Sequence, residues 1–182
     1  MLEIIVVLLF PLALVYAAVR DLTSYEIPNW LSLAIVADFM VAAALGSIEI
    51  SAVGWHLGAG LAVLVAGIVL YSRGILGGGD AKLLAACAVW VGWAGLPRFG
   101  LLVAISGGLL ALAVIGLRRI GLANSVSDTA WVRRLGSADY GVPYAVAIGV
   151  GVVVMFKDMP LVAAFASRVL EPWGAAMTFA AL

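Results

Sequence analysis

Two aspartates of this chain stand at the ends of apolar segments, where carboxyl groups are able to do chemistry. Asp21 ends the first apolar run and opens a polar loop that continues to Asn29. Asp80 follows three glycines, shortly before another apolar run begins at Leu83. Two carboxyl groups held close together share one proton, so that one acts as a base toward water while the other polarises a carbonyl group. The pair predicts an aspartyl protease if the fold brings Asp21 and Asp80 together.

The composition indicates that the elements holding these residues lie in a membrane. Of the 182 residues, 65% are hydrophobic and 11% are charged, and the mean hydropathy is +1.20. A soluble domain carries about a quarter charged residues, so this chain cannot cover itself with polar surface. We therefore expect an all-α, polytopic membrane helical bundle, embedded in the lipid bilayer and forming a single domain over residues 1–182.

Six segments are apolar over nearly the length that a span requires, which is about 20 residues. A later segment, 160–182, is also apolar but contains Arg168, Glu171 and Pro172. It is an interfacial helix, a re-entrant segment or a poor seventh span. Four tryptophans near the expected ends support these boundaries: Trp30, Trp55, Trp90 and Trp93. The expected spans are 3–20, 30–47, 53–71, 82–97, 99–117 and 141–157.

The distribution of basic residues predicts the orientation. Lys and Arg favour the cytoplasmic side, and most of them here fall on or beside the first, third and fifth connections. We therefore expect a multi-pass protein of the inner (cytoplasmic) membrane with its N-terminus outside and both aspartates at the cytoplasmic face. The first apolar run is expected to be a retained span, because Glu3 precedes it and Arg20 follows it, the reverse of a signal peptide. The basic residues concerned are Arg20, Arg73, Lys82, Arg118, Arg119, Arg133 and Arg134.

Residues beside each aspartate have expected supporting roles. Pro28 and Asn29 interrupt the chain before the second span and fix how the loop re-enters the membrane. Lys82 either acts electrostatically on Asp80 or, as we favour, anchors its helix at the lipid headgroups. Three consecutive glycines do not readily continue a helix and would leave the backbone free to approach a substrate strand. These glycines are Gly77, Gly78 and Gly79.

Other ionisable residues give competing assignments. Asp38 lies inside the second span, roughly 12 Å deep at 1.5 Å per residue. A carboxyl group there is a functional candidate by default, although we expect it to stay protonated and to bond a neighbouring helix. Glu26 and Asp139 are rival acids on the cytoplasmic side. We expect His56 at the outer interface and Cys87 in packing.

The residues suggest no metal and no cofactor. A single cysteine excludes an intrachain disulfide, and no Cys/His cluster is present in the sequence to hold zinc. The glycine run fits neither the phosphate-loop pattern nor the dinucleotide pattern. A formal net charge of zero gives no reason to expect nucleic-acid binding. The sequence makes no prediction of the oligomeric state.

Two motifs resemble those of the type IV prepilin peptidase family, which are GxGD aspartyl proteases. The first is Asp21 followed by Ile27-Pro28-Asn29, and the second is Gly77-Gly78-Gly79-Asp80-Ala81-Lys82-Leu83-Leu84. The stretch Val142-Pro143-Tyr144-Ala145 and the residues to Gly149 also resemble the family's last conserved span. The resemblance runs from residue 10 to about 155. It implies that Asp21 and Asp80 are the catalytic pair and gives Pro143 and Tyr144 supporting roles.

The resemblance also implies a subtype and a substrate. Larger prepilin peptidases carry a zinc-binding domain with paired Cys-x-x-Cys motifs and methylate the new N-terminus, whereas this chain has one cysteine and a short first connection. It is similar to the short TadV/CpaA-like form that processes Flp-type pilins; an archaeal preflagellin peptidase would look much alike. The implied substrate is a prepilin whose short basic leader is cut at the cytoplasmic membrane face, just before its hydrophobic helix.

Two alternatives remain. An intramembrane protease of the signal-peptide-peptidase kind carries Tyr before its first aspartate, where this chain has Arg20. A non-enzymatic assembly scaffold or a small transporter subunit would not need Asp21 and Asp80 close together. Their separation in the fold therefore discriminates between an enzyme and a scaffold.

Overall fold

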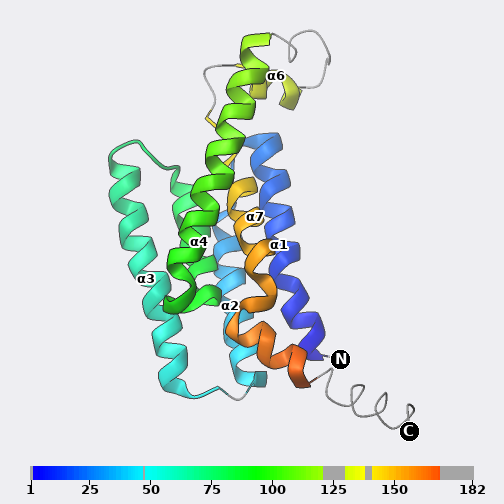
Figure 1. Cartoon of the computed structure of the whole chain (residues 1–182), viewed down its shortest axis with the longest axis vertical. Coiled ribbons are helices and arrows are strands. Elements are labelled where there is room, and N and C mark those ends of the chain that lie inside the picture. Colours follow the sequence, from blue (N-terminus) through cyan, green and yellow to red (C-terminus); the bar gives the residue numbers. More distant parts are fainter. Residues whose placement is uncertain (1, 47, 121–129, 138–140, 169–182) are drawn as a thin grey trace, which may run out of the picture.

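Every regular element of the computed structural model is a helix within the residues it describes, which are 2–46, 48–120, 130–137 and 141–168. The longer helices lie along the long axis of the molecule (Figure 1). The prediction of an all-α bundle is confirmed. The elements are α1 (Leu2–Ser24), α2 (Asn29–Gly46), α3 (Ile50–Ser72), α4 (Gly78–Ile120), α6 (Ala130–Gly136), α7 (Tyr144–Met155) and the short 3-10 helix η1 (Phe156–Asp158).

The chain is a multi-pass membrane protein. Among the described residues, four helices, α1 to α4, are long and apolar enough to cross a membrane. A bent pair, Tyr144–Asp158 with Pro160–Arg168 at 45°, passes the same criterion only when taken together. The part of 160–182 beyond residue 168 lies outside the described residues, so the choice among its three alternatives stays open. Two predicted spans, 82–97 and 99–117, fall within α4, so the count of about six is approximate.

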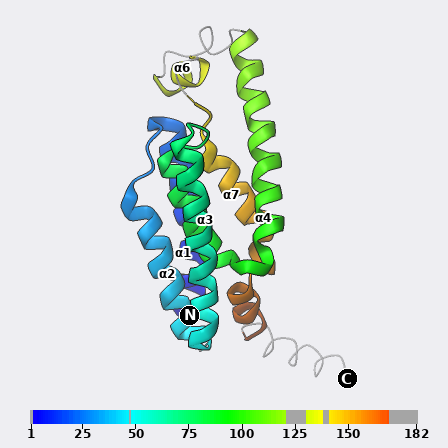
Figure 2. The same ribbon diagram turned by 90° about the vertical axis from the view of Figure 1, so that its left-hand side faces the viewer.

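Helix α4 changes direction at Gly92, whose φ of 68° and ψ of 170° are not helical. An L side chain rarely adopts this conformation, whereas glycine does so readily. The first arm (78–91) lies beside α3, and the second arm (93–120) returns as a long separate helix (Figure 2). The break comes earlier than the predicted boundary near residue 98. His56 is not simply interfacial: it is half-buried, with Nδ1 2.6 Å from the Val89 carbonyl oxygen and its ring against Gly92.

The two ends of the bundle carry different connections. The aspartate end, as we call it, holds the connections at 25–28, 73–77 and 141–143, whereas the opposite end holds the α2–α3 connection, the break at Gly92 and the start of α1 (Figures 1 and 2). The first, third and fifth predicted connections therefore share one end, as the sequence predicted. Which end faces the cytoplasm stays a prediction.

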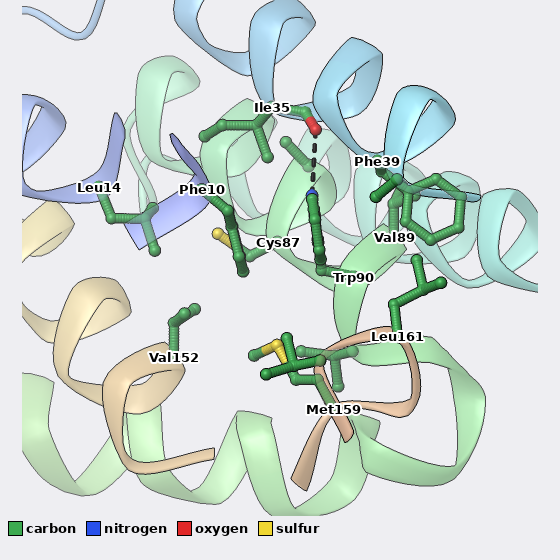
Figure 3. Close-up of a cluster of buried hydrophobic side chains, with 14 of the residues drawn as sticks. Phe10, Leu14, Ile35, Phe39, Cys87, Val89, Trp90, Val152, Met159 and Leu161 are labelled. Carbon is green, nitrogen blue, oxygen red and sulfur yellow. Dashed lines mark hydrogen bonds between the residues drawn. The ribbon is translucent and has the colours of Figure 1, made fainter. Parts of the chain in front are cut away.

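The hydrophobic core is centred on Trp90, on the first arm of α4 (Figure 3). Its indole stacks on Phe10 of α1 with ring centroids 4.6 Å apart, and its Nε1–H donates to the Ile35 carbonyl oxygen at 3.0 Å. The prediction that Trp90 lies at a membrane interface is wrong, because the side chain is fully buried. Cys87 is buried in the same cluster, as expected for a packing residue. This core holds α1, α2 and α4 together and so fixes the ends that carry Asp21 and Asp80.

Candidate active site

Asp21 lies in the last turn of α1 rather than in the loop that the sequence predicted. The helix continues to Ser24, and Tyr25 ends it with a φ of 56° while its N–H donates to the Asp21 carbonyl oxygen at 2.9 Å. The connection to α2 is therefore short. Because Asp21 is helical and its side chain is buried, its carboxyl group points from a rigid element into the bundle.

The carboxyl group of Asp21 caps the beginning of α7. Its Oδ2 accepts a hydrogen bond from the Ala145 backbone N–H at 2.8 Å. Free N–H groups at a helix N-terminus favour a carboxylate acceptor, and Pro143, the residue before α7, supplies no N–H of its own. The stretch Val142-Pro143-Tyr144-Ala145 thus has a structural role, because it places one backbone N–H against Asp21. The sequence alone did not predict this role.

Asp80 lies in the first turn of α4, and the glycines before it are not the open loop that we expected. Gly78 and Gly79 are already helical. The Asp80 carboxyl group bonds back to the backbone N–H of Gly77, as an acidic residue in the first turn often does. A Cβ on Gly77 would lie 2.6 Å from Asp80 Oδ2, so glycine leaves the space that this contact needs. The other oxygen, Oδ1, is buried and has no hydrogen-bond partner among the described residues.

The neighbouring glycines accommodate other parts of the same chain. A Cβ on Gly79 would lie 3.2 Å from Ile27 Cβ, and one on Gly78 would lie 3.4 Å from the Tyr71 ring. The loop after α1 and the end of α3 therefore approach the start of α4 closely. A role of these glycines toward a substrate stays a prediction.

Asp21 and Asp80 meet at two cavities. One cavity of about 860 Å³ extends from both aspartates along the second arm of α4, and another of about 480 Å³ is enclosed by the loop 25–29 and the residues 77–79. Both side chains line both cavities, and the two carboxyl groups are close enough to interact electrostatically. The fold therefore brings two carboxyl groups that are distant in the sequence to the same cavities. The catalytic roles themselves stay a prediction.

Tyr144 lies beside the two aspartates in the larger cavity, near enough to Asp80 for a direct charge interaction. Its ring fits against Gly107 of the second arm, where a Cβ would lie 2.6 to 2.7 Å from the ring edge and the hydroxyl. The Ser106 hydroxyl also donates to the Ala147 carbonyl oxygen at 3.0 Å, which ties this arm to α7. Sequence reasoning missed Gly107; its signal was a Ser-Gly-Gly step inside an apolar span.

Lys82 does not reach the aspartates. Its Nζ donates to Asn29 Oδ1 at 2.7 Å, which joins the starts of α4 and α2. Pro28 accepts the Leu31 N–H at 3.0 Å through its carbonyl oxygen, and it lines the smaller cavity together with Asn29. The supporting residues of the loop therefore hold the start of α2 beside the glycines, whereas Lys82 lies on another face.

The rival acids are distributed differently. Glu26 is exposed and lines the smaller cavity. Asp38 lines a separate cavity of about 290 Å³ between α1 and α2, and its Oδ2 is buried without the expected hydrogen bond to a neighbouring helix in the described part of the chain. Asp139 lies outside the described residues. No group of three or more His, Cys, Asp or Glu side chains among the described residues is arranged to hold a metal ion.

Comparison with known proteins gives the context of this site. The model for the type IV leader peptidase family matches residues 8–112, more than half of the chain and a stretch that includes both aspartates. A stretch of 57 residues is 42% identical to a prepilin leader peptidase/N-methyltransferase of Pectobacterium carotovorum subsp. carotovorum. It covers 31% of this chain and 20% of that relative, so the match spans about a fifth of the relative's length. No solved structure matches. By the family match, the chain belongs to the type IV leader peptidase family.

Proposed function

We propose that this chain is a membrane aspartyl endopeptidase that removes the short leader of a prepilin, with Asp21 and Asp80 as its acid and base. The observation that carries the proposal is that two carboxyl groups distant in the sequence line the same two cavities. Membership of the type IV leader peptidase family supports the activity. The name of the bacterial relative supports prepilins as the substrate class.

The chemistry needs one water molecule between the two carboxyl groups and the scissile carbonyl group. One carboxylate takes a proton from the water as its oxygen attacks the carbonyl carbon, and the other carboxyl group donates its proton to the carbonyl oxygen. The carboxyl group that took the water proton then passes it to the amine nitrogen as the C–N bond breaks, and the other carboxylate takes a proton back from a hydroxyl of the tetrahedral intermediate, which restores the shared proton. The Ala145 N–H occupies one oxygen of Asp21, whereas Asp80 Oδ1 is buried and has no hydrogen-bond partner among the described residues.

The two cavities differ in the way that the two sides of a prepilin cleavage site differ. The smaller cavity is lined by charged residues, Arg20 and Glu26, beside the aspartates, and we assign it to the basic leader. The larger cavity is mostly apolar, and we assign it to the hydrophobic segment that follows the leader. Its wall on α4 has small residues on one helix face, which permit close packing of another helix. These residues are Gly100, Ala104, Gly107 and Ala111.

The proposal also includes the location and the subtype. The basic residues of the aspartate end support a cytoplasmic active site in the inner membrane, with the N-terminus outside. We assign the short TadV/CpaA-like form and Flp-type prepilins on the motif resemblance of the sequence. Cleavage at the cytoplasmic face would follow from this orientation.

The experiment is cleavage of a co-expressed Flp-type prepilin by the wild type, Asp21→Asn and Asp80→Asn. Asparagine keeps the size of the side chain but cannot share the proton or act as the base. We expect each change to lower cleavage by about 1000-fold or more, while the protein still accumulates in membranes. Asp158→Asn, the same substitution at the opposite end of the bundle, is the matched control and should cleave normally.

Three results would correct the proposal. Cleavage by Asp21→Asn or Asp80→Asn would transfer the role to another acid, with Glu26, Asp38 and Asp139 tested next. Cleavage of other type IV prepilins but not of Flp-type prepilins would replace the substrate assignment and keep the chemistry. A wild type that accumulates and cuts no prepilin would support the scaffold alternative.

A further inference from the structure

A groove on another face of the bundle has the shape and polarity of a lipid site. It has a volume of about 450 Å³ and lies between α2 and α3, with the first arm of α4 as its floor. Both α2 and α3 pack on α4 more extensively than on each other, which leaves the space between them. Each of the three helices contributes residues at positions i, i+3, i+4 and i+7, starting from Asn29, Leu57 and Lys82. One face of each helix therefore forms one wall.

The polar atoms of this groove gather at its aspartate end. Lys82 is exposed and donates to Asn29 across the mouth, at 2.7 Å. None of the ion pairs among the described residues involves Lys82, so its positive charge has no acidic partner there. Deeper in the groove the walls are apolar, with Val36, Leu57 and Val89. The groove thus has a cationic end beside the aspartate end of the bundle and an apolar remainder that runs toward the middle of the helices. A phospholipid in a bilayer has the same order, with its headgroup at the membrane surface and its acyl chains inside.

The hydroxyl of Ser32 is a second, independent indication of a ligand. Ser32 lines the groove, is only 9% exposed, and its Oγ has no hydrogen-bond partner among the described residues. A buried hydroxyl without a partner costs free energy. It lies one turn, about 5 Å, along α2 from Asn29, between the Lys82 end of the groove and its apolar walls.

The charge at the open end of the groove favours a lipid headgroup over a hydrophobic helix as the occupant. Lys82 is exposed and has no acidic partner among the described residues, and an anionic headgroup would supply one. The walls run for about 10 Å, seven steps of 1.5 Å along each helix, a length that part of one acyl chain would fill.

We propose that this groove binds an anionic phospholipid, with its phosphate at Lys82, its ester oxygens at Ser32 and an acyl chain along the apolar walls. Lys82 lines neither cavity that holds the aspartates, so the site does not depend on the proposed peptidase activity. Asn29 lines both this groove and the smaller aspartate cavity. A bound lipid would thus support the loop that encloses that cavity.

The test is native mass spectrometry of the full chain in detergent with phosphatidylglycerol and phosphatidylcholine that carry the same acyl chains. We expect the wild type to retain phosphatidylglycerol about fivefold better, because a basic residue near an anionic headgroup contributes about that factor. Lys82→Gln should remove this preference, and Lys157→Gln, the matched loss of an exposed lysine at the other end of the bundle, should keep it. Val36→Phe, at a half-buried position of the wall, should lower retention of both lipids, because the larger side chain fills the apolar part of the groove that would hold the acyl chain.

Four results would overturn the proposal. One is equal retention of the two lipids by the wild type, and another is a loss in Lys82→Gln no larger than that in Lys157→Gln. Displacement of the lipid by millimolar inorganic phosphate would mean that the site binds an anion alone and that the apolar walls do not bind an acyl chain. Displacement by a hydrophobic helical peptide would assign the groove to a protein helix.

Discussion

The two ends of the bundle hold their acidic side chains in different ways. At the opposite end, Asp158 pairs with Arg98 at 2.7 Å, and Glu3 lies 3.7 Å from Arg168. At the aspartate end, Asp21 and Asp80 accept backbone N–H groups and form no ion pair within the described residues. Two arginines at that end donate to backbone carbonyl oxygens, Arg118 to Leu135 and Arg134 to Thr23, and Lys82 donates to the Asn29 side chain.

The acidic groups of the opposite end stabilise the structure, whereas those of the aspartate end stay available for chemistry. An ion pair with arginine would occupy the carboxylate oxygens and hold both groups ionised, which removes the shared proton that the chemistry needs. A backbone N–H fixes the direction of a carboxyl group and leaves its other oxygen open. Groups kept without their usual partners are typical of functional sites, where local stability is given up. The comparison predicts that changes at the aspartate end affect cleavage, whereas changes at the opposite end affect stability slightly.

The largest of the remaining effects is expected for Gly77→Ala. Its Cβ would lie 2.6 Å from Asp80 Oδ2, so the carboxyl group must turn away from its place. A displacement of about 1 Å in a catalytic group can cost about 100-fold in rate, and we expect a loss of that size in prepilin cleavage. Gly116→Ala, which adds a Cβ with nothing within 4 Å, is the control. Normal cleavage by Gly77→Ala would indicate that the position of Asp80 is not critical.

A smaller effect is expected for Gly107→Ala, which acts through Tyr144. The added Cβ displaces the ring that lies against Gly107 and so moves its hydroxyl from Asp80. Because the Tyr144 hydroxyl lies near Asp80, we expect cleavage at matched protein levels to fall about tenfold, the size typical of losing one polar interaction with a charged group. The neighbouring Gly108→Ala meets nothing within 4 Å and should cleave normally.

Tyr144→Phe separates two explanations of that result. It should lose about as much activity as Gly107→Ala if the hydroxyl matters. Full activity of Tyr144→Phe beside a loss in Gly107→Ala would mean that the added methyl group narrows the cavity, and that Tyr144 has no role in the chemistry.

The sequence predicted the parts of the fold that follow from local composition. Apolar length placed α1, α2 and α3 within a few residues of their observed ends, because the requirement to span a membrane is local. The reversal at Gly92 was placed late, since a glycine in an apolar run gives no sign of a positive φ until its neighbours are known. Trp90 was misplaced for the same reason: the reversal puts this indole in the core instead of at an interface.

The candidate site was predictable in its residue types but not in its contacts. Asp21 and Asp80 stood out because charges are rare in this chain. Their partners did not, since the Ala145 and Gly77 donors are backbone groups that any residue but proline supplies. Both aspartates were also placed in loops, whereas both are helical. Helix ends extend beyond the apolar run when capping contacts from other elements satisfy the terminal groups.

The smallest effect is expected at the opposite end, for Arg98→Gln. The Arg98–Asp158 pair is short, but the two side chains are 56% and 37% exposed. Exposed ion pairs contribute about 0.2–1 kcal/mol, so we expect a decrease in unfolding free energy of at most about 1 kcal/mol, measured by thermal unfolding of the purified protein. Cleavage per folded molecule should be unchanged, because this pair only ties the beginning of the second arm to η1. A tenfold loss of cleavage in Arg98→Gln, without a matching loss of folded protein, would mean that the two ends of the bundle are coupled and that the contrast between them is wrong.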